Sequence, residues 1–280
     1  KDPIVKFDNV TYYYPGTNRP AIEGVNFTIE KGETVLITGP SGAGKSTLCY
    51  MLNGIIPNSY GGDLQGQVLV NGMNIAESTI GELAFTSGLL FQDPSGQLIA
   101  STVEDEIAFG PENRGLSVEE INEIVEKYIN YVNMKQFSER PPQALSGGQQ
   151  QLVAFASILA MEPEIYILDE PTSNLDPLGS EMIFQLMKRI AKELNKTVIL
   201  VEHKIDKVIN LVDRIIVMDK GRIIYDGLPK DVMSNYERLI DIGVIPPQIT
   251  QITSMLRDKK GLDVEVKTSL EEGVEELKKV

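Results

Sequence analysis

The chain has 280 residues, 42% of them hydrophobic, so it is long enough to bury a substantial core as a folded protein. The 40 acidic residues outnumber the 26 Lys and Arg and give a net charge of −14, which disfavours non-specific nucleic-acid binding because phosphate contacts need a cationic surface. The longest nearly continuous apolar run, Leu152 to Met161, is too short to span a membrane, and the first residues show no charged-then-apolar leader. We therefore expect a cytoplasmic location.

The amino-terminal part of the chain predicts mainly strands, with one helix among them. The stretches "IVKFDNV" and "VNFTI" alternate roughly between apolar and polar residues and are rich in β-formers. "TVLITG" at 34–39 is a continuous apolar run, and "QGQVLVNG" is bounded by glycines. The expected helix starts after the glycine-rich stretch "GPSGAGKST" and contains the apolar residues "LCYML".

That glycine-rich stretch matches the pattern G-x-x-x-x-G-K-[ST], with a strand before it and a helix after it. Gly42 and Gly44 let the backbone curl so that successive N–H groups face one anion, and the helix start adds to the same field. Lys45 would reach the outer phosphates, and Ser46 would bind Mg²⁺. An isolated glycine-rich loop is often a plain surface turn, but the lysine and serine in register favour a nucleotide site. The expected contacts are Gly39, Pro40, Ser41, Gly42, Ala43, Gly44, Lys45, Ser46 and Thr47.

Two carboxylates follow a second buried strand in "EIYILDEPTSNLDP". Ile165 to Leu168 are apolar on both faces, as in a parallel strand covered on each side. Ligands bind at the carboxyl ends of such strands, and alternation sends Asp169 and Glu170 to different sides. We expect Asp169 to serve the metal shell and Glu170 to act as the base for the attacking water. The alternative is a solvated acidic turn.

Two further polar residues follow predicted strands and could complete a hydrolytic site. Gln92 in "LLFQDP" is placed to sense the γ-phosphate, and His203 ends the β-run at 197–202, which should lie beside the Asp169 strand. A lone histidine is more often structural, but this placement favours a role in orienting water and phosphate. The segment 195–198, "NKTV", does not supply the guanine-reading N-K-x-D, so a GTPase is disfavoured.

A second glycine-rich stretch, "ALSGGQQQLVAFA" at 144–156, precedes a run that looks like a buried helix face. Gly147 and Gly148 stand at the helix start, where free N–H groups and the helix dipole attract anions, and Ser146 adds a hydroxyl. The first glycine-rich loop already surrounds one nucleotide. We therefore expect this second phosphate site to act on the nucleotide of another subunit.

A helix is also predicted between these two sites, in "LSVEEINEIVEKYINYV". Ser117 and Glu120 form a capping-box pattern at its start. The apolar residues recur at helical spacing and predict one buried stripe, made of Val118, Ile121, Val125, Tyr128 and Val132.

Six motifs in order, "GPSGAGKST", "FQDP", "LSGGQ", "YILDEP", "SNLD" and "VEH", resemble the ATP-binding subunit of an ABC transporter, over roughly residues 4 to 230. The resemblance implies an α/β P-loop NTPase fold with a RecA-like lobe, an antiparallel β patch and an inserted helical lobe. We expect an ATP-binding domain at 1–233, with the helical lobe at about 93–162, and a carboxyl-terminal extension at 234–280. It also implies a two-chain sandwich that closes around ATP and opens on hydrolysis.

The resemblance assigns roles to individual residues. Tyr14 in "VTYYYPG" would stack on adenine, and Gln92 would join Ser46 in binding Mg²⁺, with Asp169 acting through the metal's water shell. Glu170 would polarise the attacking water, and His203 would fix the γ-phosphate. The residues implied at the interface between chains are Ser146, Gly147, Gly148, Gln149 and Asp176.

Two stretches are similar to the ATPases of energy-coupling factor (ECF) transporters: "FQDPSGQLIASTVEDEIAFGPENRG", which includes Gln97, and "IGVIPPQI" at 242–249. This resemblance implies an identical or related second ATPase chain, a membrane scaffold held around 92–99, and a separate membrane protein that binds a vitamin or metal ion. It also implies a peripheral position on the cytoplasmic face of the membrane, an extension that contributes to pairing, and no nucleic-acid partner.

Two other classes share the P-loop and the signature. DNA-repair or chromosome-organising ATPases separate their halves by a long coiled coil, and no sustained heptads lie between "GPSGAGKST" and "LSGGQ". Translation factors of this kind usually carry two such domains, whereas one is found here. Stimulation by a membrane scaffold, by DNA or by ribosomes would separate the three classes.

Overall fold

The computed structural model of the chain describes residues 3–173 and 175–279. Its strands form an antiparallel four-stranded sheet in the order β2-β1-β4-β5 and a six-stranded sheet in the order β10-β9-β3-β8-β7-β6. The first sheet contains β1 (Val5–Tyr13), β2 (Ile22–Ile29), β4 (Asp63–Val70) and β5 (Met73–Asn74). The second contains β3 (Thr34–Thr38), β6 (Ser87–Leu90), β7 (Ile165–Asp169), β8 (Thr197–Val201), β9 (Arg214–Asp219) and β10 (Arg222–Gly227).

The six-stranded sheet is parallel except for its edge strand β10, which pairs antiparallel with β9. Every residue of β3, β7 and β8 is buried, which explains why these strands are continuous apolar runs in the sequence. β7 lies between β6 and β8, and Asp169 pairs with Val201. The predictions of a buried parallel strand before Asp169, and of a neighbouring strand before His203, are confirmed.

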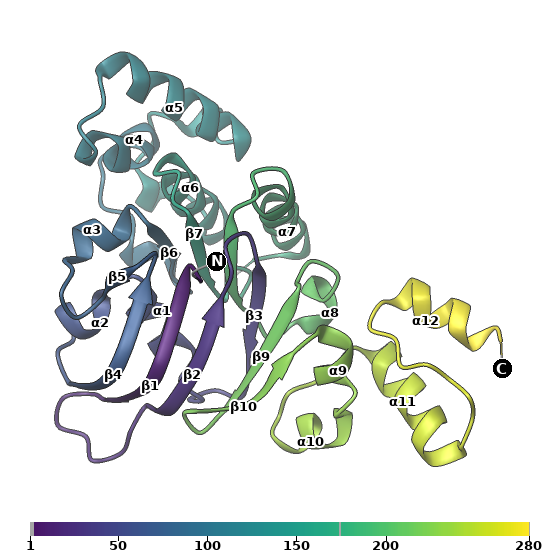
Figure 1. The fold of residues 1–280 in the computed structure, drawn as a ribbon. Coiled ribbons are helices and arrows are strands. Elements are labelled where there is room, and N and C mark those ends of the chain that lie inside the picture. Colours follow the sequence, from purple (N-terminus) through teal and green to yellow (C-terminus); the bar gives the residue numbers. More distant parts are fainter. Residues whose placement is uncertain (1–2, 174, 280) are drawn as a thin grey trace.

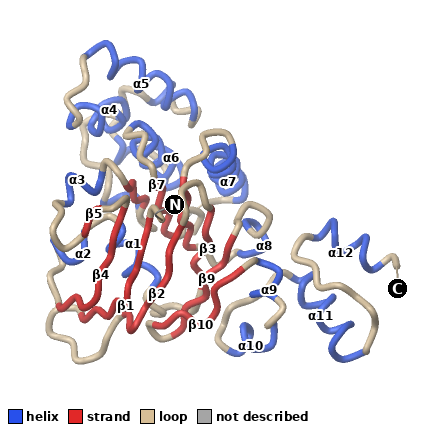
Figure 2. Tube along the Cα trace, viewed as in Figure 1, coloured by secondary structure: helices blue, strands red, loops and turns tan. Residues whose placement is uncertain are grey.

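The helices cover both faces of this sheet, and α4, α5 and α6 gather into a lobe beyond one end of it (Figure 1). The antiparallel sheet lies to one side, and α11 and α12 form the part of the molecule farthest from it (Figure 2). The helices are α1 (Lys45–Leu52), α2 (Ile55–Asn58), α3 (Ile80–Ala84), α4 (Val103–Asn113), α5 (Val118–Tyr131), α6 (Gly147–Ala160), α7 (Pro177–Lys192), α8 (Ile205–Val208), α9 (Pro229–Met233), α10 (Tyr236–Asp241), α11 (Gln248–Lys260) and α12 (Leu270–Leu277). Short 3-10 turns occupy Pro94–Gly96, Lys135–Phe137 and Pro142–Ala144. Within the described residues, no helix is both long and apolar enough to cross a membrane.

The core consists of two hydrophobic clusters, one on each face of the six-stranded sheet. Alternation along the strands separates them: Leu36 belongs to one cluster, while Val35 and Ile37 belong to the other. The first cluster includes buried residues of α4 to α7, and the second includes those of α1 and of the antiparallel sheet. Because the sheet is packed on both faces, the loops at the carboxyl ends of its strands are held on a rigid base.

The helix predicted after Ser117 is α5, and the capping box between Ser117 and Glu120 is confirmed. Val125 and Tyr128 are buried as expected. The prediction is wrong for Val118, which is 68% exposed. It is the first helical residue, and this turn extends past the part of α5 that packs against its neighbours.

Candidate functional site

The first glycine-rich loop connects β3 to α1 and follows tight steric limits. An ideal Cβ on Gly39, whose φ is 150°, would lie 2.1 Å from the carbonyl oxygen of Met218. Gly44, the N-cap of α1, has a φ of 103°, and its Cβ would lie 2.8 Å from the carbonyl oxygen of Ala21. Neither position can hold a side chain without moving backbone. The loop is therefore pressed against β9 and the start of β2.

Lys45 opens α1, and its side chain turns back across this loop. Its Nζ donates to the carbonyl oxygens of Gly39 at 2.9 Å and Pro40 at 3.0 Å, and the residue is 6% exposed. Burial lowers the pKa of the Lys45 ammonium, while the charges of Glu170 and Asp169 act in the opposite direction. A phosphate in the loop would give this buried ammonium a charged acceptor, which makes a stronger bond than a carbonyl oxygen does.

Asp169 ends β7 and is 3% exposed. Within the described residues, its Oδ1 is buried without a hydrogen-bond partner. Burial raises the pKa of the Asp169 carboxyl, with a contribution from the Glu170 charge, while a hydrogen bond from Ser46 and the Lys45 charge lower it. An unpartnered buried carboxylate oxygen is costly, and a cation or its bound water would relieve that cost.

The oxygen-bearing side chains here suit Mg²⁺, which prefers oxygen ligands and combines one or two carboxylates with water and substrate phosphates. Ser46 offers a hydroxyl, Gln92 an amide oxygen and Asp169 its carboxylate. Across the described part of the chain, no three His, Cys, Asp or Glu side chains group as a metal cage. The residues therefore fit a metal shared with a nucleotide rather than one held by protein alone.

Glu170 is the point where three loops meet. Gln92, after β6, donates from Nε2 to Glu170 Oε2 at 2.9 Å. His203, after β8, places Nε2 3.1 Å from Glu170 Oε1, and Nε2 donates to this oxygen in the tautomer that carries its hydrogen there. β6, β7 and β8 are adjacent in the sheet, so the three side chains predicted separately from the sequence lie together.

The backbone at Glu170 is in the left-handed region, with a φ of 48°. A non-glycine residue adopts this conformation at an energetic cost, and such residues concentrate at functional sites. The turn sends the Glu170 side chain toward Gln92 and His203, while Asp169 points toward the first glycine-rich loop. The two carboxylates therefore face different sides, as the alternation predicts: Glu170 bonds to the loops after β6 and β8, and Asp169 interacts with Ser46 and Lys45 of the P-loop.

Tyr14, the residue expected to stack on adenine, is half-buried beside the start of α1. Its hydroxyl lies 3.1 Å from Oγ1 of Thr47, the last residue of the glycine-rich motif. Its ring contacts those of Tyr12 and Tyr60, with centroids 4.9 and 5.9 Å away. These contacts place an aromatic face next to the P-loop, and the stacking role stays a prediction.

The second glycine-rich stretch begins α6, with Ser146 as N-cap and Gln149 as its capping-box partner. The Ser146 hydroxyl accepts from the Gln149 N–H at 3.4 Å and keeps its own hydrogen to donate elsewhere. Asp176 caps α7 by accepting from the Gly179 N–H at 2.7 Å. Asn174 of "SNLD" lies outside the described residues.

A hollow of about 470 Å³ joins these two helix starts. It is lined by Ser146, Gly148, Gln149, Leu152, Asp176, Leu178, Gly179 and Met182. No residue of 39–47 lines it, so the structure does not bring the signature stretch to the chain's own P-loop. The hollow faces outward, where a second chain could complete it.

Two residues of the site have functions that the sequence did not reveal. Gln97 donates from Nε2 to the Leu89 carbonyl at 3.1 Å and accepts from the Phe91 N–H at 3.4 Å, which steadies the loop that carries Gln92. Glu202 is a buried carboxylate next to His203. Its only signal in the sequence is an acidic residue at the end of the apolar run 197–202, and this pattern does not distinguish Glu202 from a residue in a surface turn.

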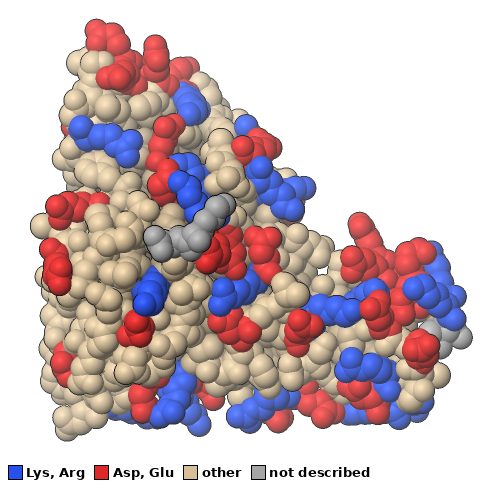
Figure 3. All heavy atoms as spheres, in the orientation of Figure 1, with Lys and Arg blue, Asp and Glu red and all other residues tan. Residues whose placement is uncertain are grey.

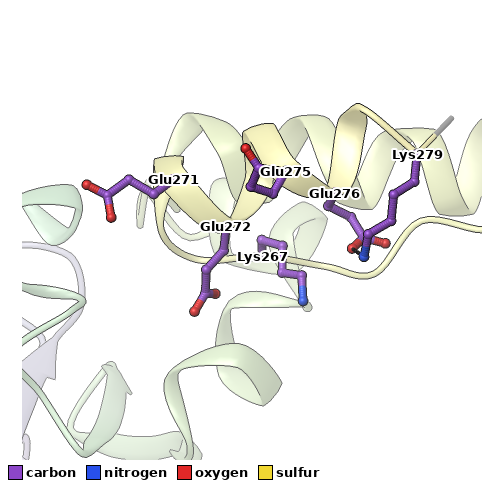
Figure 4. A pocket seen from close by; sticks show the side chains of 6 residues that line it. All are labelled: Lys267, Glu271, Glu272, Glu275, Glu276 and Lys279. Carbon is purple, nitrogen blue, oxygen red and sulfur yellow. Dashed lines mark hydrogen bonds and ion pairs between the residues drawn. The ribbon is translucent and has the colours of Figure 1, made fainter.

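A second hollow, of about 390 Å³, runs along α12 and is lined by glutamate and lysine side chains: Lys267, Glu271, Glu272, Glu275, Glu276 and Lys279 (Figure 4). Its most buried member, Glu276, accepts from the Glu265 N–H and pairs with Lys279. These contacts are those of a structural ion network. On the face seen in Figure 3, positive and negative side chains are interspersed rather than gathered into one basic area.

Comparisons with known proteins agree with this fold. The family described as "ABC transporter" matches residues 22–173. An ABC transporter ATP-binding protein of Methanosarcina mazei is 44% identical over 91% of this chain and 43% of its own length. The energy-coupling factor transporter ATP-binding protein EcfA1 of Caldanaerobacter subterraneus subsp. tengcongensis is 39% identical over 93% of each chain. This chain therefore spans less than half of the first relative and nearly all of the second.

Solved structures give the same result. CbiO1 of Clostridium perfringens, described as part of the ABC transporter complex cbiONQ, superposes with a TM-score of 0.74 at 35% identity, over 90% of this chain and 99% of CbiO1. The dimeric ATP-binding cassette MJ0796 bound to ADP and Pi gives 0.71 at 32% identity, over 80% of this chain and 98% of MJ0796.

The fold and the converging loops define a P-loop ATPase cassette of α/β architecture, as the sequence predicted. The chain belongs to the ABC transporter ATP-binding family. The alternatives of a DNA-repair ATPase or a translation factor are not favoured by these matches.

Proposed function

We propose that the chain hydrolyses ATP as one of two paired cassettes and so powers a membrane transporter. The observation that carries this proposal is the convergence of Gln92, Glu170 and His203 beside the buried ammonium of Lys45. A carboxylate held by two polar side chains at the edge of a phosphate cradle has the chemistry to orient and deprotonate a water molecule.

In this mechanism each residue has one task. The P-loop amides and Lys45 bind the phosphates, and His203 donates toward the γ-phosphate. Glu170 accepts the proton of the attacking water. Ser46, Gln92 and Asp169 would hold Mg²⁺, which when bound supplies positive charge to the phosphate oxygens. Tyr14 would offer its ring to adenine.

The pairing of two chains is supported by the separate position of the signature hollow. Ser146, Gly147, Gly148 and Gln149 form the start of α6, where the helix dipole favours an anion, and no residue of this chain's P-loop lines the hollow beside it. We propose that the nucleotide of the second chain, identical or paralogous, occupies it and that Asp176 reaches across the interface. The dimeric structure of MJ0796 supports this arrangement for the fold.

The proposed transporter is of the ECF type and takes up a vitamin or metal ion. Similarity to EcfA1 and to CbiO1 supports this choice. The loop after Gln92 and the helix α4 that follows it also offer a docking surface, since Ile99 of the loop is 68% exposed and Phe109 of α4 is 48% exposed. Glu106 fixes this loop by accepting from the N–H groups of Ile99 at 2.8 Å and Ala100 at 2.7 Å. Helices of a membrane scaffold would pack on these apolar side chains, which places the chain at the cytoplasmic face of the membrane.

We further propose that residues 1–233 form the ATP-binding domain, with the helical lobe at about 93–162, and that 234–280 is an extension used in pairing. The packing of α4, α5 and α6 in one cluster supports the lobe. The exposure of Ile245 at 68% and Leu270 at 69% supports a contact surface on the extension.

Affinity capture from detergent-solubilised native membranes tests the ECF assignment. We expect one membrane scaffold, a second ATPase chain or copy, and a separate small membrane protein that binds the substrate. Recovery of paired substrate-lined membrane domains with a water-soluble binding protein would contradict the ECF type. ATPase activity that rises with DNA or ribosomes, and not with the captured membrane partners, would contradict transport.

A further inference from the structure

Glu202, the last residue before His203, is a carboxylate buried inside the site. It is 3% exposed. Its Oε1 accepts from the backbone N–H groups of His203 at 2.8 Å and Lys204 at 3.1 Å. Its Oε2 accepts from the hydroxyl of Thr172 at 2.7 Å, and Thr172 is itself fully buried. In the described part of the chain, Glu202 forms no ion pair.

These three hydrogen bonds join two loops that are far apart in sequence. Thr172 lies in the loop after β7, two residues beyond Glu170, and His203 lies in the loop after β8. Burying a charge is costly unless hydrogen bonds compensate it, and bonds to a charged acceptor are stronger than neutral ones. The carboxylate is therefore a stiff bridge between the loop of the proposed base and the loop of the proposed phosphate contact.

We propose that Glu202 is a positioning residue that sets the distance between His203 and Glu170. The inference rests on the proposed ATPase function. The contact of 3.1 Å between His203 Nε2 and Glu170 Oε1 joins the same two loops, and Glu202 holds the backbone N–H of His203 in one loop and the side-chain hydroxyl of Thr172 in the other. Small displacements of catalytic groups reduce rates strongly, so loss of the bridge lowers turnover although Glu202 has no direct role in the mechanism proposed above.

The bonding pattern allows a conservative replacement. In Glu202→Gln, the amide oxygen can still accept from the two backbone N–H groups, and the amide nitrogen can donate to the Thr172 hydroxyl. The bridge then survives without its charge. Glu202→Ala removes all three bonds, and Thr172→Val removes one of them at similar side-chain shape, while Thr172→Ser keeps the hydroxyl.

Steady-state ATPase kinetics of these variants test the bridge, in the assembled complex if the chain alone is silent. We expect Glu202→Ala and Thr172→Val to lower kcat, by about 10- to 100-fold for the former, with KM for ATP nearly unchanged. Glu202→Gln and Thr172→Ser should keep most of the activity. An unchanged kcat in Glu202→Ala, or equal damage from the glutamine and alanine substitutions, would overturn the proposal.

A double-mutant cycle tests whether Glu202 acts through His203. Once His203→Ala has removed the side chain that Glu202 positions, adding Glu202→Ala should cause little further loss of kcat. If the two losses multiply, Glu202 acts by another route and the proposal is wrong. If Glu202→Ala fails to fold, Thr172→Val replaces it in the cycle with His203→Ala, and Thr172→Ser serves as the conservative control.

Amide hydrogen exchange separates this proposal from the function on which it rests. In Glu202→Ala, peptides that contain His203 and Lys204 should exchange faster than in the wild type, whereas Glu202→Gln should keep their protection. This readout does not need turnover. If Glu170→Gln retains full activity, the proposed function is wrong, but amide hydrogen exchange still tests the bridge. If exchange is unchanged in Glu202→Ala, the bridge does not hold these loops, whatever the ATPase assay gives.

Discussion

Replacing Glu170 by glutamine should abolish turnover and leave the fold and ATP binding intact. The change removes the ability to take up a proton but keeps the shape. The new amide can still accept from Gln92 and can donate to His203 in the tautomer that accepts. Loss of a general base lowers rates by about 10²–10⁴-fold, which corresponds to roughly 3–5 kcal/mol of activation free energy. Hydrogen bonds of the neutral side chain are weaker, so we expect the free energy of unfolding to stay within about 1 kcal/mol of the wild type.

Thermal unfolding with ATP and Mg²⁺ measures the retained binding. A ligand at a hundred times its dissociation constant adds about 2.7 kcal/mol to the stability if only the folded state binds. An unfolding entropy of about 2.1 cal/mol/K per residue gives about 0.6 kcal/mol/K for 280 residues, so Tm should rise by about 5 °C. The rise should be the same in the wild type and in Glu170→Gln.

The matched control is Glu123→Gln, the same chemical change on the exposed face of α5, which should leave both turnover and the Tm shift unchanged. Phosphate release from radiolabelled ATP gives the rate over the required range. Wild-type turnover in Glu170→Gln would show that another group deprotonates the water. A loss of the Tm shift in the same variant would show that Glu170 holds the nucleotide rather than activating water.

Three further results are expected. Lys45→Ala and Ser146→Arg should each inactivate a homodimer, yet a mixture of the two should regain at most about a quarter of the wild-type ATPase rate. Random pairing makes half the dimers mixed, and each mixed dimer has one intact site. If no activity returns although exchange of chains is shown, the two chains do not share their ATP sites. Burial raises the pKa of Asp169 above its unfolded value, so the ionised carboxyl destabilises the fold at neutral pH and this penalty disappears as pH falls through the folded pKa to the unfolded one. Asp169→Asn should therefore have a higher free energy of unfolding in denaturant than the wild type at pH 7, and this difference should vanish near pH 4. A variant less stable than the wild type at pH 7 would show that burial of the ionised carboxyl does not destabilise the fold. Gly39→Ala should eliminate the Tm shift with ATP, because its Cβ would lie 2.1 Å from a backbone oxygen, whereas Gly81→Ala, in open space on α3, should keep it; an equal shift in both would refute the steric explanation.

Much of the fold followed from local patterns. Continuous apolar runs predicted β3, β7 and β8 because parallel strands buried on both faces need no polar side. The capping box at Ser117 predicted the start of α5 because its two hydrogen bonds lie within one turn of chain. Val118 failed because periodicity gives the direction of a side chain but not how far the neighbouring helices extend.

The candidate site was predictable where a motif carries its own geometry. Lys45 and Ser46 are fixed by a loop of few residues, and Gln92, Glu170 and His203 each follow a strand whose neighbours could be guessed. Glu202 could not be found in this way. Its bridge to Thr172 depends on the side-by-side placement of β7 and β8, and its burial depends on the packing above them, so neither is visible in a linear pattern.

The loop from Gln92 to Ile99 connects the proposed base to an exposed apolar side chain, and this connection bears on how the rate of ATP hydrolysis is controlled. One end of this loop holds an oxygen of Glu170 through the Gln92 amide, and the other end presents Ile99 to its surroundings. Glu170 accepts from Gln92 on one oxygen and lies beside His203 Nε2 on the other, so a shift of Gln92 changes the direction in which the free lone pairs of the carboxylate point. A membrane partner that moves Ile99 would thus change the orientation of the proposed base. We therefore expect a chain without its partner to hydrolyse little ATP.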